Sequence, residues 1–200
     1  MKSLLLMALA LIPLTTTAAY AAPKVGEMAP EFTATDTNGK TVSLSEFKGK
    51  TVVLEWTNPD CPFVKKHYDG GNMQSLQTTA TADGVVWIAI NSSAKDKEGN
   101  YSATELNKIY ADKKSAQTHL IIDETGTIGT LYAAKTTPHM FVIDKDGKLA
   151  YAGAIDDNSS ADKADIATSK NYVTAAIADL KAGKAVETSS TNPYGCGVKY

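Results

Sequence analysis

One short segment limits the possible fold more than any other part of the chain. Residues 51–56, Thr-Val-Val-Leu-Glu-Trp, are almost continuously apolar, which is typical of a central parallel strand buried on both faces. Residues 57–60, Thr-Asn-Pro-Asp, must form a loop. Cys61-Pro62 then opens a predicted helix, because proline suits a first helical position, where its missing N–H would be unpaired anyway. The pattern predicts an α/β fold in which Cys61 lies just beyond the carboxyl end of a strand.

The patterns on either side predict a mixed sheet flanked by helices. We expect strands at 32–36 and 41–44 around an Asn-Gly turn, a helical turn at 45–47, a helix from 62 to about 80 that a Gly-Gly pair kinks or splits, a strand at 85–90, a helix at 104–115, a strand at 119–122, a helix at 128–133, antiparallel strands at 137–144 and 149–154, and a helix at 160–182. The tail, 184–200, is expected to be irregular.

The first 21 residues are expected to be a signal peptide. Lys2 gives a positive start, residues 4–14 form an apolar run too short to span a bilayer, and Ala19-Tyr20-Ala21 fits a cleavage site. An uncleaved membrane anchor is the alternative. We expect export to the periplasm, no stable membrane anchor and a mature chain that starts near Ala22.

The charge and the cysteine content limit the classes of function that the chain can have. The net charge is −2 and every basic residue is lysine, so nothing points to a nucleic-acid partner. The two cysteines, Cys61 and Cys196, can pair in an oxidising compartment, but two are too few for a disulfide scaffold. Cys61 is the candidate nucleophile, since the N–H groups at a helix start favour a thiolate, and Lys65 shares its helix face. A buried, inert cysteine is the alternative.

Two segments resemble a known family. Val25-Gly26-Glu-Met-Ala-Pro-Glu-Phe32, and the pattern from Asp36 to Lys50, are similar to the N-terminal signature of the redoxins, the alkyl hydroperoxide reductase/thiol-specific antioxidant branch of the thioredoxin superfamily. The ending, residues 192–200, resembles a peroxiredoxin-like subgroup of thioredoxin family proteins. The resemblance implies a thioredoxin-like domain at 24–183 with an N-terminal β-hairpin, followed by the tail 184–200 that carries Cys196.

The sequence departs from the better-known branches of this superfamily. Thioredoxins carry Cys-x-x-Cys, whereas here the segment is Cys61-Pro-Phe-Val64. Peroxiredoxins add an arginine near their cysteine, and this chain has none. For a peroxide substrate, Thr57 or the helix N–H groups would have to replace that arginine, so disulfide exchange is the preferred activity.

The resemblance also implies further site residues. Glu55 takes the place of the buried aspartate that relays protons in thioredoxin; a strand-end glutamate that points to water is the alternative. The Thr137-Pro138 bond is expected to be cis, with the Thr137 backbone free to pair with a substrate chain. Pro62 and Phe63 are expected to contact the substrate, and His139 either lines the site or packs structurally.

Cys196 is the candidate resolving cysteine. A structural disulfide with Cys61, an intermolecular bridge and a free thiol remain the alternatives. Cys61 together with His67, His119 or His139 could form a soft copper site, but we expect no metal and no cofactor.

Together these features predict an exported thiol-dependent oxidoreductase that acts through Cys61 on disulfides or peroxides and is served by a thiol reductant. The alternative is a non-catalytic thioredoxin-like module that binds a partner protein or copper, with structural cysteines.

Overall fold

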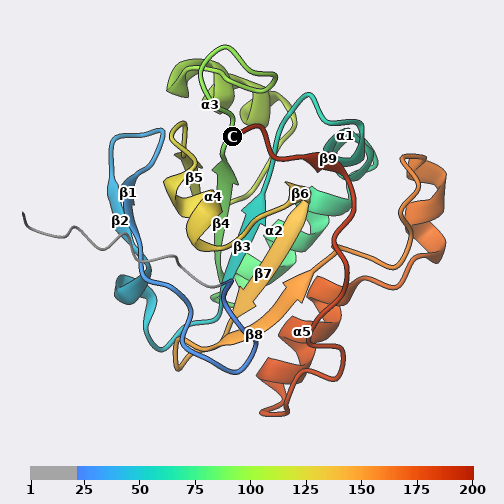
Figure 1. Cartoon of the computed structure of the whole chain (residues 1–200). Coiled ribbons are helices and arrows are strands. Elements are labelled where there is room, and N and C mark those ends of the chain that lie inside the picture. The colour runs from blue at the N-terminus through green and yellow to red at the C-terminus, as the bar shows by residue number, and fades with distance from the viewer. Residues whose placement is uncertain (1–21) are drawn as a thin grey trace, which may run out of the picture.

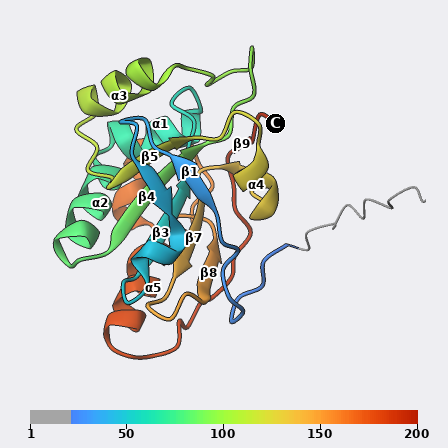
Figure 2. The same ribbon diagram turned by 90° about the vertical axis from the view of Figure 1, so that its left-hand side faces the viewer.

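The computed structural model describes residues 22–200, so the predicted signal peptide lies outside the described residues. The centre is a five-stranded mixed sheet with helices on its two faces (Figures 1 and 2). No helix within residues 22–200 is long and apolar enough to cross a membrane.

The elements alternate along the chain much as the patterns predict. The strands are β1 (Thr33–Thr35), β2 (Thr41–Ser43), β3 (Val52–Trp56), β4 (Val86–Asn91), β5 (His119–Ile122), β6 (Thr136–Thr137), β7 (His139–Ile143), β8 (Leu149–Gly153) and β9 (Cys196–Gly197). The helices are α1 (Pro62–Asp69), α2 (Asn72–Ala82), α3 (Ala103–Asp112), α4 (Thr127–Leu131) and α5 (Tyr172–Lys181), with the 3₁₀ helices η1 (Leu44–Phe47) and η2 (Lys163–Thr168).

The sheet has the order β5-β4-β3-β7-β8. β3 pairs in parallel with β4, and β4 with β5, whereas β7 runs antiparallel to both β3 and β8. β1 and β2 form a separate antiparallel hairpin. The predicted thioredoxin-like architecture, a central mixed sheet with an N-terminal hairpin, is confirmed.

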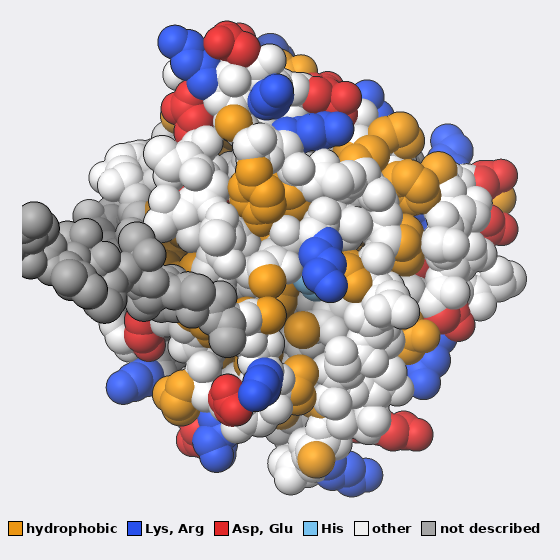
Figure 3. Space-filling view, in the orientation of Figure 1, with side chains coloured by type: hydrophobic (Ala, Val, Ile, Leu, Met, Phe, Trp, Pro, Cys, Tyr) orange, Lys and Arg blue, Asp and Glu red, His pale blue; other side chains and the backbone are white. Residues whose placement is uncertain are grey.

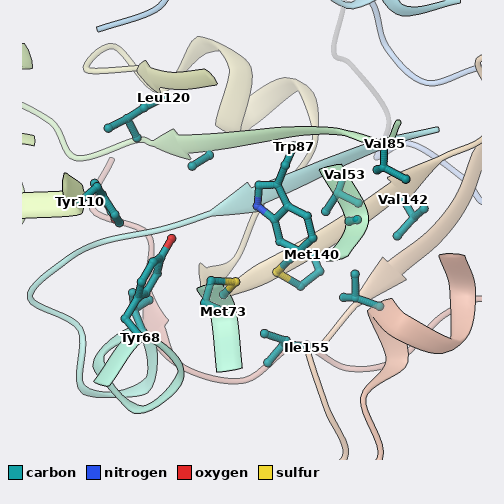
Figure 4. Close-up of a cluster of buried hydrophobic side chains, with 14 of the residues drawn as sticks. Val53, Tyr68, Met73, Val85, Trp87, Tyr110, Leu120, Met140, Val142 and Ile155 are labelled. Atoms are coloured by element: carbon teal, nitrogen blue, oxygen red, sulfur yellow. The ribbon is translucent and has the colours of Figure 1, made fainter. Parts of the chain in front are cut away.

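Strand alternation divides the buried side chains into two clusters. Val53 on β3 packs with Trp87 and with side chains of α1, α2, α3 and α5 (Figure 4). Leu54, its neighbour, packs on the opposite face with side chains of the hairpin, η1 and α4. Because side chains alternate along a strand, Glu55 shares the face of Val53 and points towards α1, α2 and α3.

Two expectations for the helices meet different outcomes. The expected split in the helix after Cys61 is confirmed, since α1 ends at Asp69 and α2 begins at Asn72. The single helix expected at 160–182 is wrong, because η2 and α5 are separate. The Asn171 side chain accepts a hydrogen bond from Thr174 N at 2.9 Å and so starts a new helix as its N-cap.

The C-terminal segment is more ordered than its composition suggests. It leaves α5, passes β8 and continues to the opposite end of the sheet (Figure 1). There β9 pairs antiparallel with β6, in the register Thr137 to Cys196 and Thr136 to Gly197. The tail was expected to be irregular, but its last part is a short strand joined to the domain.

Candidate active site

The turn after β3 places Cys61 at the start of α1. Cys61 is the N-cap residue and Pro62 occupies the first turn, as the sequence predicts. The turn is held by its own polar groups: Cys61 N donates to Asn58 O at 3.1 Å, and Asp60 N donates to Asn58 Oδ1 at 2.9 Å. Asn58 itself is buried, so a fixed loop sets the position of the cysteine.

Two polar groups contact the Cys61 sulfur. The thiol donates to the Thr137 carbonyl oxygen at 3.0 Å, and its Sγ lies 2.6 Å from Cys196 Sγ. Both cysteines are free thiols in this structure. Cys61 has no exposed surface and belongs to the buried apolar cluster around Val53, but its sulfur also meets the second thiol and the Thr137 carbonyl group before Pro138. The reactivity of Cys61 stays a prediction.

The loop that faces Cys61 has the predicted backbone geometry. The Thr137-Pro138 peptide bond is cis, as the resemblance implies. The Thr137 backbone was expected to be free for a substrate chain, but it pairs with Cys196 of the chain's own tail. The Thr137 side chain is buried, and its Oγ1 has no hydrogen-bond partner among the described residues.

Cys196 lies on β9 and is half-buried. Burial, and next the hydrogen bond with Cys61, raise its pKa to about 12. In the reduced protein Cys196 therefore stays a neutral thiol near neutral pH, positioned directly beside Cys61.

Glu55 is buried completely, so the alternative of a strand-end glutamate in water is wrong. Its carboxylate accepts hydrogen bonds from Tyr68 Oη at 2.9 Å, Gln77 Nε2 at 3.1 Å and Trp87 Nε1 at 2.8 Å. Burial raises the pKa of Glu55, and these donors oppose that shift. A buried carboxyl group with a raised pKa suits proton transfer, and the relay role stays a prediction.

The hydroxyl group of Thr57 is hydrogen-bonded within the protein. Thr57 is buried, and its Oγ1 lies 2.7 Å from Tyr110 Oη. Tyr110 belongs to the same buried cluster as Tyr68 (Figure 4). The hydroxyl that was expected to stand in for a peroxide-binding arginine is thus already hydrogen-bonded.

The remaining predicted site residues lie around the loop and the tail. His139 is buried; its Nδ1 accepts from Lys135 N at 3.2 Å, and its ring lies 4.4 Å from that of Phe141. Burial lowers the pKa of His139 to about 3. Phe63 packs edge-on against Tyr194 of the tail, with ring centroids 5.9 Å apart, and Pro62 is exposed. Substrate contacts by these residues stay predictions.

The sequence interpretation missed a buried polar cluster that holds the tail. The Tyr194 hydroxyl donates to the Asp156 carboxylate. His67 Nε2 lies 3.2 Å from Tyr194 Oη, and Lys66 Nζ lies 3.7 Å from Asp156 Oδ2. Lys66, His67 and Asp156 are all buried, whereas Lys65, the lysine expected to support Cys61, is exposed. The only available signal was a tyrosine two residues before Cys196 in a polar tail.

The proton positions in this cluster follow from its contacts. Burial lowers the pKa of His67 to about 4, so the ring is neutral near neutral pH. Asn72 Nδ2 lies 2.8 Å from His67 Nδ1. If the amide donates there, Nε2 carries the proton and donates to the Tyr194 oxygen, while the Tyr194 hydroxyl donates to Asp156.

The three histidines that were considered as copper ligands each contact another polar group of the protein. His67 contacts Tyr194, His119 Nδ1 lies 2.9 Å from Asp36 Oδ2, and His139 accepts from Lys135 N. Across residues 22–200, no group of three or more histidine, cysteine or acidic side chains is placed to hold a metal ion.

This fold, with a cysteine at the start of α1 facing a cis-proline loop, defines a thioredoxin-like protein. Residues 25–152 match the family model described as the AhpC/TSA family, and the chain belongs to that family. The thiol-disulfide oxidoreductase ResA of Bacillus thuringiensis subsp. konkukian is 30% identical over 126 residues, which is 63% of this chain and 67% of that protein. The predicted family and enzyme class are therefore confirmed.

Two solved structures extend the comparison. An uncharacterized conserved protein from Geobacillus kaustophilus has a TM-score of 0.76 and 25% identity, covering 88% of this chain and 92% of its own. A putative thiol:disulfide interchange protein DsbE from Chlorobium tepidum has a TM-score of 0.54 and 25% identity, covering 66% and 85%. The first alignment is too long to fit within residues 25–152, so it includes segments outside the family match.

Proposed function

We propose that this protein is an exported thiol-disulfide oxidoreductase whose redox pair is Cys61 and Cys196. The pair passes between a dithiol and an intramolecular disulfide, and two electrons move to or from an external disulfide or thiol. The observation that carries the proposal is the 2.6 Å separation of the two sulfurs beside the Thr137-Pro138 loop. ResA, a relative by sequence, is named for the same activity.

The placement of Cys196 supports a redox pair over two unrelated cysteines. The residues are 135 positions apart in the chain, and a free thiol on a loose tail would have no fixed distance to Cys61. Instead, the pairing of β9 with β6 fixes Cys196 opposite Thr137, the residue whose carbonyl group contacts Cys61.

Disulfide exchange is supported better than peroxide reduction. The sequence contains no arginine to hold a peroxide oxygen, and the Thr57 hydroxyl is hydrogen-bonded to Tyr110. A disulfide substrate needs no oxyanion site, because a thiolate attacks sulfur directly and expels a second thiolate.

Export to the periplasm is proposed from the sequence. The segment 1–21 has the charge, apolar length and small-residue ending of a cleaved signal peptide. In that compartment a thiol reductant must restore the dithiol form, since the surroundings are oxidising.

The test is turnover of a small disulfide by the mature protein. We expect reduction of 2-hydroxyethyl disulfide in the presence of dithiothreitol at a rate above the uncatalysed reaction, and slower consumption of hydrogen peroxide. Cys61→Ser and Cys196→Ser should both abolish this excess. Full activity in both variants, or no activity in the wild type, would overturn the proposal and favour a binding module with structural cysteines.

A further inference from the structure

The two cysteines of the proposed pair differ sharply in their access to solvent. Cys61 has no exposed surface, and Cys196 is half-buried. A thiolate must reach a disulfide sulfur in line with the bond that breaks, so access decides which of the two sulfurs is attacked.

The tail covers the backbone edge beside Cys61 and brings Cys196 against its sulfur. β9 takes up the backbone edge of β6 directly before Pro138, and Val198 N donates to Lys135 O at 3.1 Å. An extended polypeptide could add to a free strand edge, but this edge is already paired. The tail forms part of the face seen in Figure 3, where lysine lies near the centre and most other charged side chains lie towards the rim.

Contacts on both sides of Cys196 hold the tail in place. Before it, Ala154 N donates to Thr191 Oγ1 at 2.9 Å, and Tyr194 is bonded to Asp156. After it, Ala94 N donates to Lys199 O at 2.8 Å, and Tyr200 Oη donates to Ala134 O at 2.9 Å. An incoming molecule must compete with a segment of the same chain, which has a high effective concentration.

We infer that Cys196, rather than Cys61, is the sulfur at which an external thiol enters the Cys61–Cys196 disulfide. The inference rests on the proposed function. It reverses the order that the sequence suggests, in which Cys61 meets the outside partner and Cys196 only resolves the product.

Reduction of the protein disulfide takes two successive thiolate attacks. An external thiolate attacks Cys196 Sγ, the bond between the two protein sulfurs breaks, and Cys61 leaves as a thiolate at the start of α1. A second external thiolate then attacks the external sulfur of the mixed disulfide and releases Cys196. Two external thiols become one disulfide, the protein disulfide becomes a dithiol, and the two thiol protons end on Cys61 and Cys196.

Gly195 is the residue that allows this arrangement. Its φ is +133°, and a Cβ there would overlap the Thr137 carbonyl oxygen and lie 2.8 Å from the carbonyl carbon. Gly197, on the other side of Cys196, has nothing within 4 Å of such a Cβ. The two glycines therefore provide a matched pair: Gly195→Ala should lift the tail from β6, and Gly197→Ala should leave it in place.

Sulfite tests the inference on the full chain, because it splits a disulfide into one S-sulfonate and one thiolate. The oxidised mature protein is treated briefly with sodium sulfite and quenched in acid, and the S-sulfonate is located by peptide mass mapping. We expect roughly tenfold more S-sulfonate on Cys196 than on Cys61 in the folded protein. In urea, where both sulfurs are accessible to sulfite, we expect about equal amounts on the two cysteines.

The glycine variants complete the test. Gly197→Ala should keep the preference of the wild type, and Gly195→Ala should move it towards the ratio seen in urea. S-sulfonate mainly on Cys61, or a folded ratio equal to the urea ratio, would overturn the inference while leaving the redox pair intact. If the map shows no Cys61–Cys196 link before sulfite is added, the proposed function itself fails, and this inference with it.

Discussion

The Tyr194 hydroxyl donates a hydrogen bond to the buried carboxylate of Asp156. Asp156 lies just after β8 and contacts Lys66 of α1, the helix for which Cys61 is the N-cap residue. Tyr194 is two residues from Cys196, so this one bond ties the tail cysteine to the helix of its partner. The strength of this anchor should therefore influence how easily the disulfide is reduced.

Tyr194→Phe is expected to make the Cys61–Cys196 disulfide easier to reduce. A hydrogen bond to a charged group contributes about 1.5–3 kcal/mol. Because the bond is also present in the dithiol form, the shift is at most roughly 30–60 mV for a two-electron couple. The potential should become less negative, because a loosened tail holds Cys196 near Cys61 less of the time. Equilibration of the protein with dithiothreitol buffers of known potential measures the reduction potential of the disulfide. Tyr172→Phe is the control, and an equal shift in that variant would contradict the anchor.

Oxidation is expected to stabilise the fold. A link between residues 135 positions apart lowers the entropy of the unfolded chain by an amount worth about 4–5 kcal/mol in the chain-entropy model. Urea unfolding of the mature protein, with and without prior reduction, measures the difference. Cys196→Ser should show no such difference, and equal stability of the two wild-type forms would argue against an intramolecular link.

Acid is expected to destabilise the protein through its buried histidines. The pKa values of His67 and His139 fall to about 4 and about 3 in the folded state. Below pH 6.5 these two histidines therefore bind protons in the unfolded chain but stay neutral in the folded protein. The free energy of unfolding consequently decreases as the pH falls towards 4. The loss is up to about 1.4 kcal/mol per pH unit for each histidine.

Urea unfolding at pH 7, 5.5 and 4 checks this expectation. His139→Gln should cost stability at pH 7, where the packing of the ring on Phe141 is lost, but should show a weaker decline towards pH 4. A decline as steep as that of the wild type would mean that His139 does not contribute to the acid sensitivity.

Glu55→Gln tests the proton relay. If the carboxyl group carries protons for the cysteine pair, its loss should slow exchange by about 100-fold and change the shape of the pH–rate profile. Tyr68→Phe removes one donor to Glu55 but keeps the carboxyl group, so it should lower stability and retain that shape. The same unchanged shape in Glu55→Gln would show that Glu55 acts only in packing.

The sheet and the position of Cys61 could be predicted because their signals are local. The apolar run before Trp56 indicates a strand that is buried on both faces, and Pro62 indicates the first turn of a helix. The cis bond before Pro138 has no local signal, and only the family resemblance implied it. The break before α5 had a local signal, because Asn171 is a favoured N-cap residue. The apolar pattern of residues 160–182 instead led to the prediction of a single helix.

The position of the tail could not be predicted, for a physical reason. Its contacts are backbone pairs and single side chains that meet residues far away in the chain: Cys196 with Thr137, and Tyr194 with Asp156. None of these produces a period in the sequence. The burial of Lys66 was missed for the same reason, since its acidic partner comes from a loop 90 positions further on.

A redox titration with peptide mapping tests the proposed pair most directly. The mature protein is equilibrated in thiol-disulfide buffers, acid-quenched, and mapped without reduction. We predict a Cys61–Cys196 peptide that appears and disappears reversibly, with a midpoint between about −300 and −120 mV, the range of exchangeable protein disulfides. Two free thiols at every potential, or a link that persists in the most reducing buffer, would contradict a catalytic pair.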